Sequence, residues 1–88
     1  MTTAVIYTKD NCVFCTRAKT LLTKNNISYR ELIVDSMGRD DRKLAENQSW
    51  TTREELLDMR PGVKTLPQIW LDNEYVGGFT ELSHKLNL

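Results

Sequence analysis

The spacing of hydrophobic residues along the chain changes between strand-like and helix-like periods, and this pattern predicts the order of the elements. Four short apolar runs are rich in β-branched or aromatic residues and predict strands. These runs are residues 4–8, 27–34, 68–71 and 75–76. Between the first two, Phe14, Ala18, Leu21 and Leu22 recur at helical spacing, which predicts an amphipathic helix over residues 13–25.

Residues 35–62 form a polar, helix-prone segment between the second and third predicted strands. We expect one short helix over residues 39–47, whose charges of both signs would cover an exposed face. Thr51 or Thr52 then caps a second helix, because glutamates stand at the reciprocal capping-box positions. This second helix should stop at residues 60–62, Arg-Pro-Gly.

The C-terminal part of the chain predicts a hairpin and a closing helix. Residues 72–73, Asp-Asn, are a strong turn signal, and Gly77-Gly78 breaks the strand that follows. Thr80 can cap a final helix whose inward-facing residues are Leu82, Leu86 and Leu88. The order β-α-β, helical insert, β-β-α predicts a single α/β domain over residues 1–88, with a four-stranded mixed sheet flanked by helices.

Composition and charge exclude several classes of function. The 88 residues include 12 basic and 12 acidic side chains, and this balance argues against a nucleic-acid-binding protein. No apolar stretch is long enough to cross a bilayer, and the N-terminus lacks the pattern of a secretory signal. We therefore expect a cytoplasmic protein with no membrane partner.

Cys12 and Cys15 are the only cysteines of the chain. A bridge between them would close too short a loop to add much stability, so the pair is better suited to chemistry than to holding the fold together. Half of a zinc site is the alternative, but four ligands are needed and the chain offers only His84 besides the two cysteines. A closed site would require a carboxylate or a second chain.

The sequence places Cys12 where a strand and turn lead into a helix, and this position favours the reactive thiolate. Unpaired N–H groups and the positive end of the helix dipole should lower its pKa from roughly 8.5 into the range of about 3.5 to 7.5. Lys9 can add a nearby positive charge. Cys15 lies one turn further in, so we expect Cys12 to attack and Cys15 to resolve.

Two other segments could hold a ligand. In Thr65-Leu66-Pro67 a cis proline would expose the Leu66 backbone beside the thiols, but the sequence does not choose between the isomers. The Gly77-Gly78 pair removes side chains where another backbone could approach. The N–H groups of Thr80 and Glu81 then begin a helix and suit a carboxylate, while the Glu81 side chain could receive an amine. A plain glycine turn with a capped helix is the alternative.

Taken together, these segments resemble the glutaredoxin family over nearly the whole chain. The resemblance rests on four matches in the family's order and spacing: Tyr7-Thr8-Lys9, the Cys12/Cys15 pair, Thr65-Leu66-Pro67-Gln68 and Gly77-Gly78. It implies a thioredoxin-like fold, a cis Pro67 and a redox-active disulfide between the two cysteines. It also implies a dithiol oxidoreductase that reduces protein disulfides or glutathione mixed disulfides and is recharged by glutathione, with no bound cofactor or metal.

The resemblance further implies a glutathione groove. Lys9 and Lys64 would meet the glycine end, and the Thr65–Pro67 segment would pair with the cysteinyl part through the Leu66 backbone. The γ-glutamyl end would then be held by three residues near the last helix. These three are Gly78, Thr80 and Glu81.

Val13-Phe14 stands between the cysteines where the family most often has Pro-Tyr. This pair and the Gly-Gly-Phe segment look most like bacteriophage glutaredoxins, which would place a monomer in the host cytoplasm with ribonucleotide reductase as a protein partner. One alternative is a ribonucleotide reductase donor that thioredoxin reductase recharges. Another is a carrier in which two chains share a [2Fe–2S] cluster through Cys12 and two glutathiones.

Overall fold

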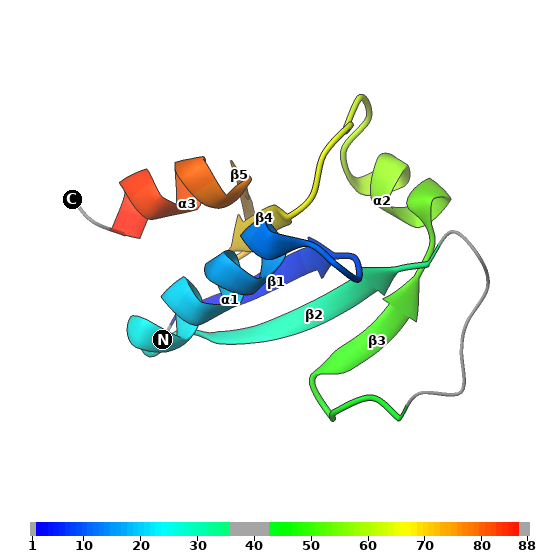
Figure 1. The fold of residues 1–88 in the computed structure, drawn as a ribbon. Helices are drawn as coiled ribbons and strands as arrows, with labels where there is room; N and C mark the ends of the chain where they lie inside the picture. The colour runs from blue at the N-terminus through cyan, green and yellow to red at the C-terminus, as the bar shows by residue number, and fades with distance from the viewer. Residues whose placement is uncertain (1, 36–42, 87–88) are drawn as a thin grey trace.

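The computed structural model describes residues 2–35 and 43–86. Five strands and three helices follow one another along this part of the chain (Figure 1). In chain order they are β1 (Thr3–Thr8), α1 (Val13–Lys24), β2 (Ser28–Val34), β3 (Gln48–Thr51), α2 (Arg53–Met59), β4 (Gln68–Leu71), β5 (Glu74–Gly77) and α3 (Phe79–Leu86). The α/β class and the predicted β-α-β start and β-β-α end are confirmed.

The strands form one mixed sheet in the order β3-β2-β1-β4-β5. The strands β1, β2 and β3 run parallel, and β4 and β5 are each antiparallel to the neighbour before them in that order. Helix α1 makes the crossover that two adjacent parallel strands require. Strand β1 is therefore central, and its C-terminal end leads directly into the turn before α1 (Figure 1).

The prediction of four strands is wrong, because the described part of the chain contains a fifth, β3, at one edge of the sheet. The neighbouring residues 43–47 are not helical, and residues 39–42 of the expected helix lie outside the described residues. Backbone pairing and polar side chains hold this edge: the Glu31 N–H donates to Asn47 O at 2.8 Å, and Gln48 Nε2 donates to Glu31 Oε1 at 3.0 Å. A strand held in this way carries no alternating apolar pattern that sequence analysis could detect.

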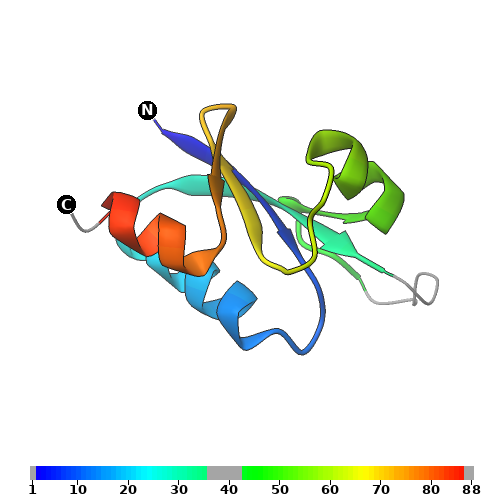
Figure 2. The ribbon, with the colours of Figure 1, turned by 90° about the horizontal axis from the view of Figure 1, so that it is seen from above.

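Two hydrophobic clusters lie on the two faces of the sheet. Helices α1 and α3 cover one face and α2 lies on the other (Figure 2). The first cluster is made of Ala4, Ile6, Ala18, Leu22, Ile27, Ile69, Leu71 and Leu82. The second is made of Tyr7, Leu56, Val63 and Trp70. Leu82 faces inward as predicted and Leu86 packs against the first cluster, whereas Leu88 lies outside the described residues.

The N-terminus of α3 differs from the prediction that Thr80 caps it. The helix begins at Phe79, and the Gly78 carbonyl accepts the first intrahelical bond from the Leu82 N–H at 3.0 Å. Glu81 Oε1 in turn accepts a bond from the Gly78 N–H at 2.7 Å. Gly78 is therefore the capping residue, and the Glu81 side chain supplies the reciprocal bond that fixes the start one residue earlier. For α2, by contrast, the cap is Thr52, which is one of the two residues expected to cap it.

Candidate active site

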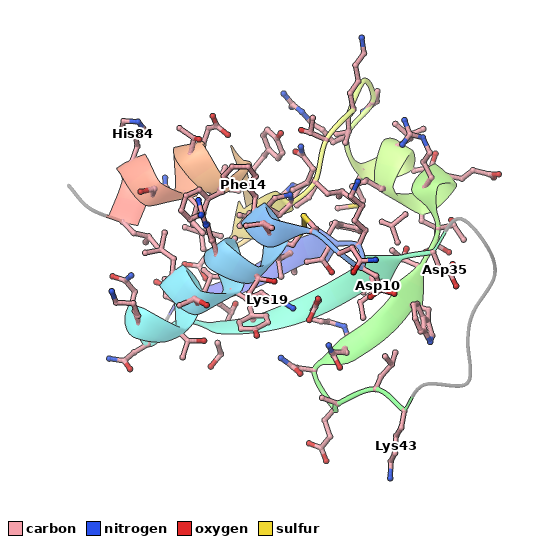
Figure 3. The ribbon with its side chains drawn as sticks, viewed as in Figure 1. Asp10, Phe14, Lys19, Asp35, Lys43 and His84 are labelled. Carbon is pink, nitrogen blue, oxygen red and sulfur yellow. A yellow bond between two sulfur atoms is a disulfide. The ribbon has the colours of Figure 1, made fainter. Side chains whose placement is uncertain are left out.

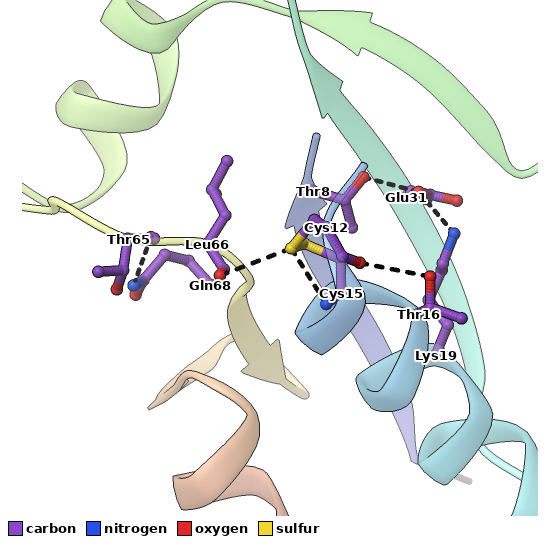
Figure 4. Close-up of a disulfide and its surroundings, with 9 residues drawn as sticks. All are labelled: Thr8, Cys12, Cys15, Thr16, Lys19, Glu31, Thr65, Leu66 and Gln68. Atoms are coloured by element: carbon purple, nitrogen blue, oxygen red, sulfur yellow. Dashed lines mark hydrogen bonds and ion pairs between the residues drawn. A yellow bond between two sulfur atoms is a disulfide. The ribbon is translucent and has the colours of Figure 1, made fainter. Parts of the chain in front are cut away.

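The two cysteines form a disulfide at the start of α1 (Figure 4). The turn after β1 ends with Asn11 in the left-handed region at φ 56°, which asparagine tolerates better than most residues. Cys12 is extended and caps the helix, and its Sγ accepts a hydrogen bond from the Cys15 N–H at 3.2 Å. Cys15 is 2% exposed, whereas Cys12 is half-buried. Cys15 is therefore the more buried of the two cysteines.

The Leu66–Pro67 peptide bond is cis, which settles the choice that the sequence left open. The segment that contains it runs beside the disulfide, although 54 residues separate Leu66 from Cys12 in the chain. The Cys12 Sγ atom lies 3.8 Å from the Leu66 carbonyl oxygen (Figure 4). A substrate sulfur that reacts with Cys12 would therefore lie next to the Leu66 main chain as well as to Cys15.

A groove of about 240 Å³ extends along this segment toward α2. It brings together four of the residues that sequence analysis assigned to the glycine and cysteinyl parts of glutathione. These four are Lys9, Lys64, Thr65 and Leu66. Arg53, the first residue of α2, also lines the groove and was missed, because only the folded chain places the start of α2 next to Lys9. The groove thus carries three cationic side chains, which suits an anionic ligand.

Gly78 lies against the cis-proline segment from the direction of β5 and α3. A Cβ at Gly78 would lie 3.4 Å from the Pro67 carbonyl oxygen, which is an ordinary van der Waals distance, so Gly78 lies directly beside the cis-proline segment. Thr80 and Glu81 follow in the exposed first turn of α3. The three residues predicted to hold the γ-glutamyl end therefore lie on the side of Pro67 that faces β5 and α3. These are Gly78, Thr80 and Glu81. One oxygen of Glu81 already accepts the Gly78 N–H.

Exposed apolar side chains lie beside Cys12. Val13 is 63% exposed and Phe14 is 52% exposed, which is unusual for residues of this size. The Phe14 ring packs against Phe79 of α3 at a centroid distance of 5.9 Å, with the Arg17 guanidinium 5.4 Å from the Phe14 centroid (Figure 3). Phe14 therefore combines contact with α3 and an exposed surface next to the disulfide.

A second depression, of about 570 Å³, opens on the flank of the disulfide toward β2 and β3. Its lining includes the buried carboxylate of Glu31, which accepts bonds from Thr8 Oγ1 at 2.6 Å, Lys19 Nζ at 3.0 Å and Gln48 Nε2 at 3.0 Å. Burial alone would raise the pKa of Glu31, but these three bonds and the Lys19 charge outweigh it and lower the pKa. Sequence analysis missed this network because its members come from three strands and a helix.

Residues 2–35 and 43–86 contain no group of three His, Cys, Asp or Glu side chains that could hold a metal ion. Within the same ranges no helix is long and apolar enough to span a membrane. His84 is exposed on α3, far along the helix from the disulfide (Figure 3).

Similarity to known proteins agrees with this geometry. The glutaredoxin family model matches residues 4–76. Glutaredoxin 3 of Escherichia coli (strain K12) is 35% identical over 82 residues, which are 93% of this chain and 83% of that protein. Glutaredoxin 1 of Rickettsia prowazekii (strain Madrid E) is 34% identical over 80 residues, 91% of this chain and 73% of that protein.

Solved structures show the same fold. The crystal structure of glutaredoxin 1 from Francisella tularensis, complexed with cacodylate, superimposes with a TM-score of 0.72 at 30% identity, over 99% of this chain and 94% of that one. The structure of reduced Escherichia coli glutaredoxin gives a TM-score of 0.69 at 25% identity, over 97% and 93% of the two chains. The fold and the paired cysteines thus define a thiol–disulfide oxidoreductase of the thioredoxin-like class. Within that class, the chain belongs to the glutaredoxin family.

Proposed function

We propose that this protein is a dithiol glutaredoxin that uses glutathione as its reductant and reduces protein disulfides and glutathione mixed disulfides. The observation that supports this most directly is the position of the Cys12 Sγ atom. It caps α1, accepts the Cys15 N–H, and lies 3.8 Å from the carbonyl oxygen of Leu66, a residue that lines a groove with three cationic side chains. This combines a site for a thiolate with a site for an anionic peptide.

The proposed reaction proceeds through a mixed disulfide. The Cys12 thiolate attacks one sulfur of the substrate disulfide, forms a bond to it, and releases the other sulfur as a thiolate that takes up a proton. The Cys15 thiolate then attacks Cys12 Sγ, closes the intramolecular disulfide and releases the second substrate thiol. Two glutathione molecules return the protein to the dithiol and leave as glutathione disulfide, so electrons and protons balance.

The groove and the first turn of α3 would hold glutathione at its two ends. Lys9, Arg53 and Lys64 line the groove and would attract the glycine carboxylate. The Leu66 backbone would pair with the cysteinyl part. Thr80 and Glu81 would then contact the γ-glutamyl end, next to Gly78 and the Pro67 carbonyl.

The protein substrate would lie across the exposed apolar pair Val13-Phe14. The resemblance of this pair to bacteriophage glutaredoxins supports ribonucleotide reductase as a candidate partner, an inference by analogy. The proposal places a monomeric protein in a reducing cytoplasm, where glutathione keeps a thiol pair ready for turnover. Residues 1–88 would then act as one domain.

The test compares two reducing systems on the same substrate. Glutathione with its reductase should drive rapid reduction of a small glutathione mixed disulfide, whereas thioredoxin reductase with NADPH should give only background turnover. The reverse preference would refute the proposed reductant and support the thioredoxin-reductase-dependent alternative. If neither reducing system supported turnover, the proposal as a whole would be refuted.

A further inference from the structure

Tyr75 of β5 is connected by hydrogen bonds to the backbone segment that faces the disulfide. Its hydroxyl donates to Oε1 of Gln68, the first residue of β4. Nε2 of the same amide donates to the Thr65 carbonyl at 3.0 Å, as Figure 4 shows. Because Gln68 is only 6% exposed, its amide depends on partners within the protein. The two bonds therefore fix which end of the amide faces Thr65.

The Tyr75 hydroxyl is itself held in place by contacts to its ring. Trp70 is the cross-strand partner of Tyr75, and the two rings meet edge-on at 5.1 Å. The Arg60 guanidinium, just after α2, lies 4.1 Å from the Tyr75 ring centroid, a distance typical of a cation–π contact. Tyr75 thus contacts the C-terminal end of α2 and the neighbouring strand of the β4–β5 hairpin, and it is linked through Gln68 to the segment before Pro67.

The bond to the Thr65 carbonyl also determines where the next N–H points. The peptide unit between Thr65 and Leu66 is planar and trans, so its carbonyl and its N–H point in opposite directions. With the carbonyl turned toward Gln68, the Leu66 N–H points away from Gln68. Within the part of the chain that the structure describes, this N–H has no acceptor, and Leu66 lines the groove beside Cys12.

We propose that Tyr75 is a positioning residue for glutathione, acting through Gln68 on the Thr65–Leu66 peptide plane. In this orientation the free Leu66 N–H can meet a peptide carbonyl of a ligand whose sulfur reacts with Cys12. Tyr75 is not among the residues that line the groove. The inference rests on the proposed function, and it predicts a change in affinity for ligands with a peptide backbone and not in thiol reactivity.

The test uses Cys15→Ser protein, which stops at the mixed disulfide. Cys12 is equilibrated with glutathione disulfide and, in parallel, with 2-hydroxyethyl disulfide, which has no peptide group. In each exchange the Cys12 thiolate bonds to one half and releases the other as a thiol, so no further reactant is needed. Tyr75→Phe removes only the hydroxyl. It should lower the glutathione equilibrium constant about fivefold, the usual net effect of one lost hydrogen bond, because the Leu66 N–H is then no longer held toward the ligand carbonyl, and leave the hydroxyethyl constant unchanged.

Two further variants complete the design. Tyr29→Phe removes a hydroxyl on the opposite face of the sheet and should change neither constant. Gln68→Met removes the connection itself, so adding Tyr75→Phe to it should produce no further loss. Equal glutathione constants for Tyr75→Phe and the parent, or equal losses with both disulfides, would overturn the inference. A parent protein that does not prefer glutathione over the hydroxyethyl group would instead refute the proposed groove, before any Tyr75 variant is made.

Discussion

The Sγ atom of Cys12 accepts a hydrogen bond from the backbone N–H of Cys15 at 3.2 Å. The same contact makes Cys12 the cap of α1 and places its sulfur at the positive end of the helix dipole. A thiolate accepts such a bond more strongly than a thiol does, so the helix start favours the nucleophilic form. The fold therefore distinguishes two cysteines that are chemically identical in the sequence.

The first prediction separates the roles of the two sulfurs. Cys12→Ser should abolish turnover of every disulfide substrate, because it removes the nucleophile. Cys15→Ser should keep much of the activity on glutathione mixed disulfides and lose reduction of protein disulfides, which requires the second thiol. Steady-state assays on both substrates check this. If Cys15→Ser lost both activities while Cys12→Ser kept one, the assigned roles would be reversed.

Arg53 provides a test of the cationic groove that the sequence did not suggest. Arg53→Ala should raise KM for a glutathione mixed disulfide by a few-fold and leave kcat nearly unchanged, since an exposed charge contributes at most about 1 kcal/mol. The effect should shrink as salt is added. Lys43→Ala is the control, because this exposed lysine lies far from the disulfide in Figure 3. An unchanged KM at low salt would remove Arg53 from the binding site.

The two glycines with positive φ form a matched pair for stability measurements. Gly62, at φ 86°, has open space where a Cβ would be, whereas a Cβ on Gly77, at φ 126°, would lie 2.9 Å from Glu81 Cγ. Gly62→Ala should cost about 1 kcal/mol for the backbone alone, and Gly77→Ala about 2 to 3 kcal/mol. Denaturant unfolding of both variants measures the difference. Equal losses would show that Glu81 moves aside freely.

Glu31 should make stability depend on acid pH. Its folded-state pKa is lowered, so the carboxylate stabilises the fold above the ordinary glutamate value of about 4.3, and this contribution is lost as pH falls through the folded-state pKa. Glu31→Gln should lower the free energy of unfolding at pH 7 by about 2 kcal/mol, because Lys19 then loses its charged partner. The difference in the free energy of unfolding between the variant and the parent should disappear in acid. A gap that persists at low pH would contradict this role.

The sequence predicted those parts of the fold that depend on hydrophobic periodicity. The strand at residues 4–8, the helix after Cys12 and the hairpin around residues 72–73 all occur. Strand β3 was missed because its pairing relies on backbone bonds and on polar contacts such as Gln48 to Glu31. These contacts join segments whose proximity no local pattern reveals.

The functional site, too, could be predicted from the sequence only where its signals are local. Local signals identified the position of Cys12 at a helix start and the Gly77-Gly78 pair, and the cis Pro67 followed from the family resemblance. Arg53 and the Tyr75–Gln68 connection became visible only in the folded chain, since each depends on elements that are distant in sequence. The start of α3 was misplaced because both Gly78 and Thr80 can cap a helix, and the bond from Gly78 to Glu81 decides between them.

The most direct test is a titration of the Cys12 thiol. In reduced Cys15→Ser protein, thiolate absorbance in the ultraviolet followed against pH gives the pKa of the single remaining cysteine. The position at the start of α1 predicts a value between about 3.5 and 7.5, well below the roughly 8.5 of free cysteine. A pKa at or above that of free cysteine would show that the helix start does not hold the sulfur as an anion, and would contradict the proposed chemistry of this site.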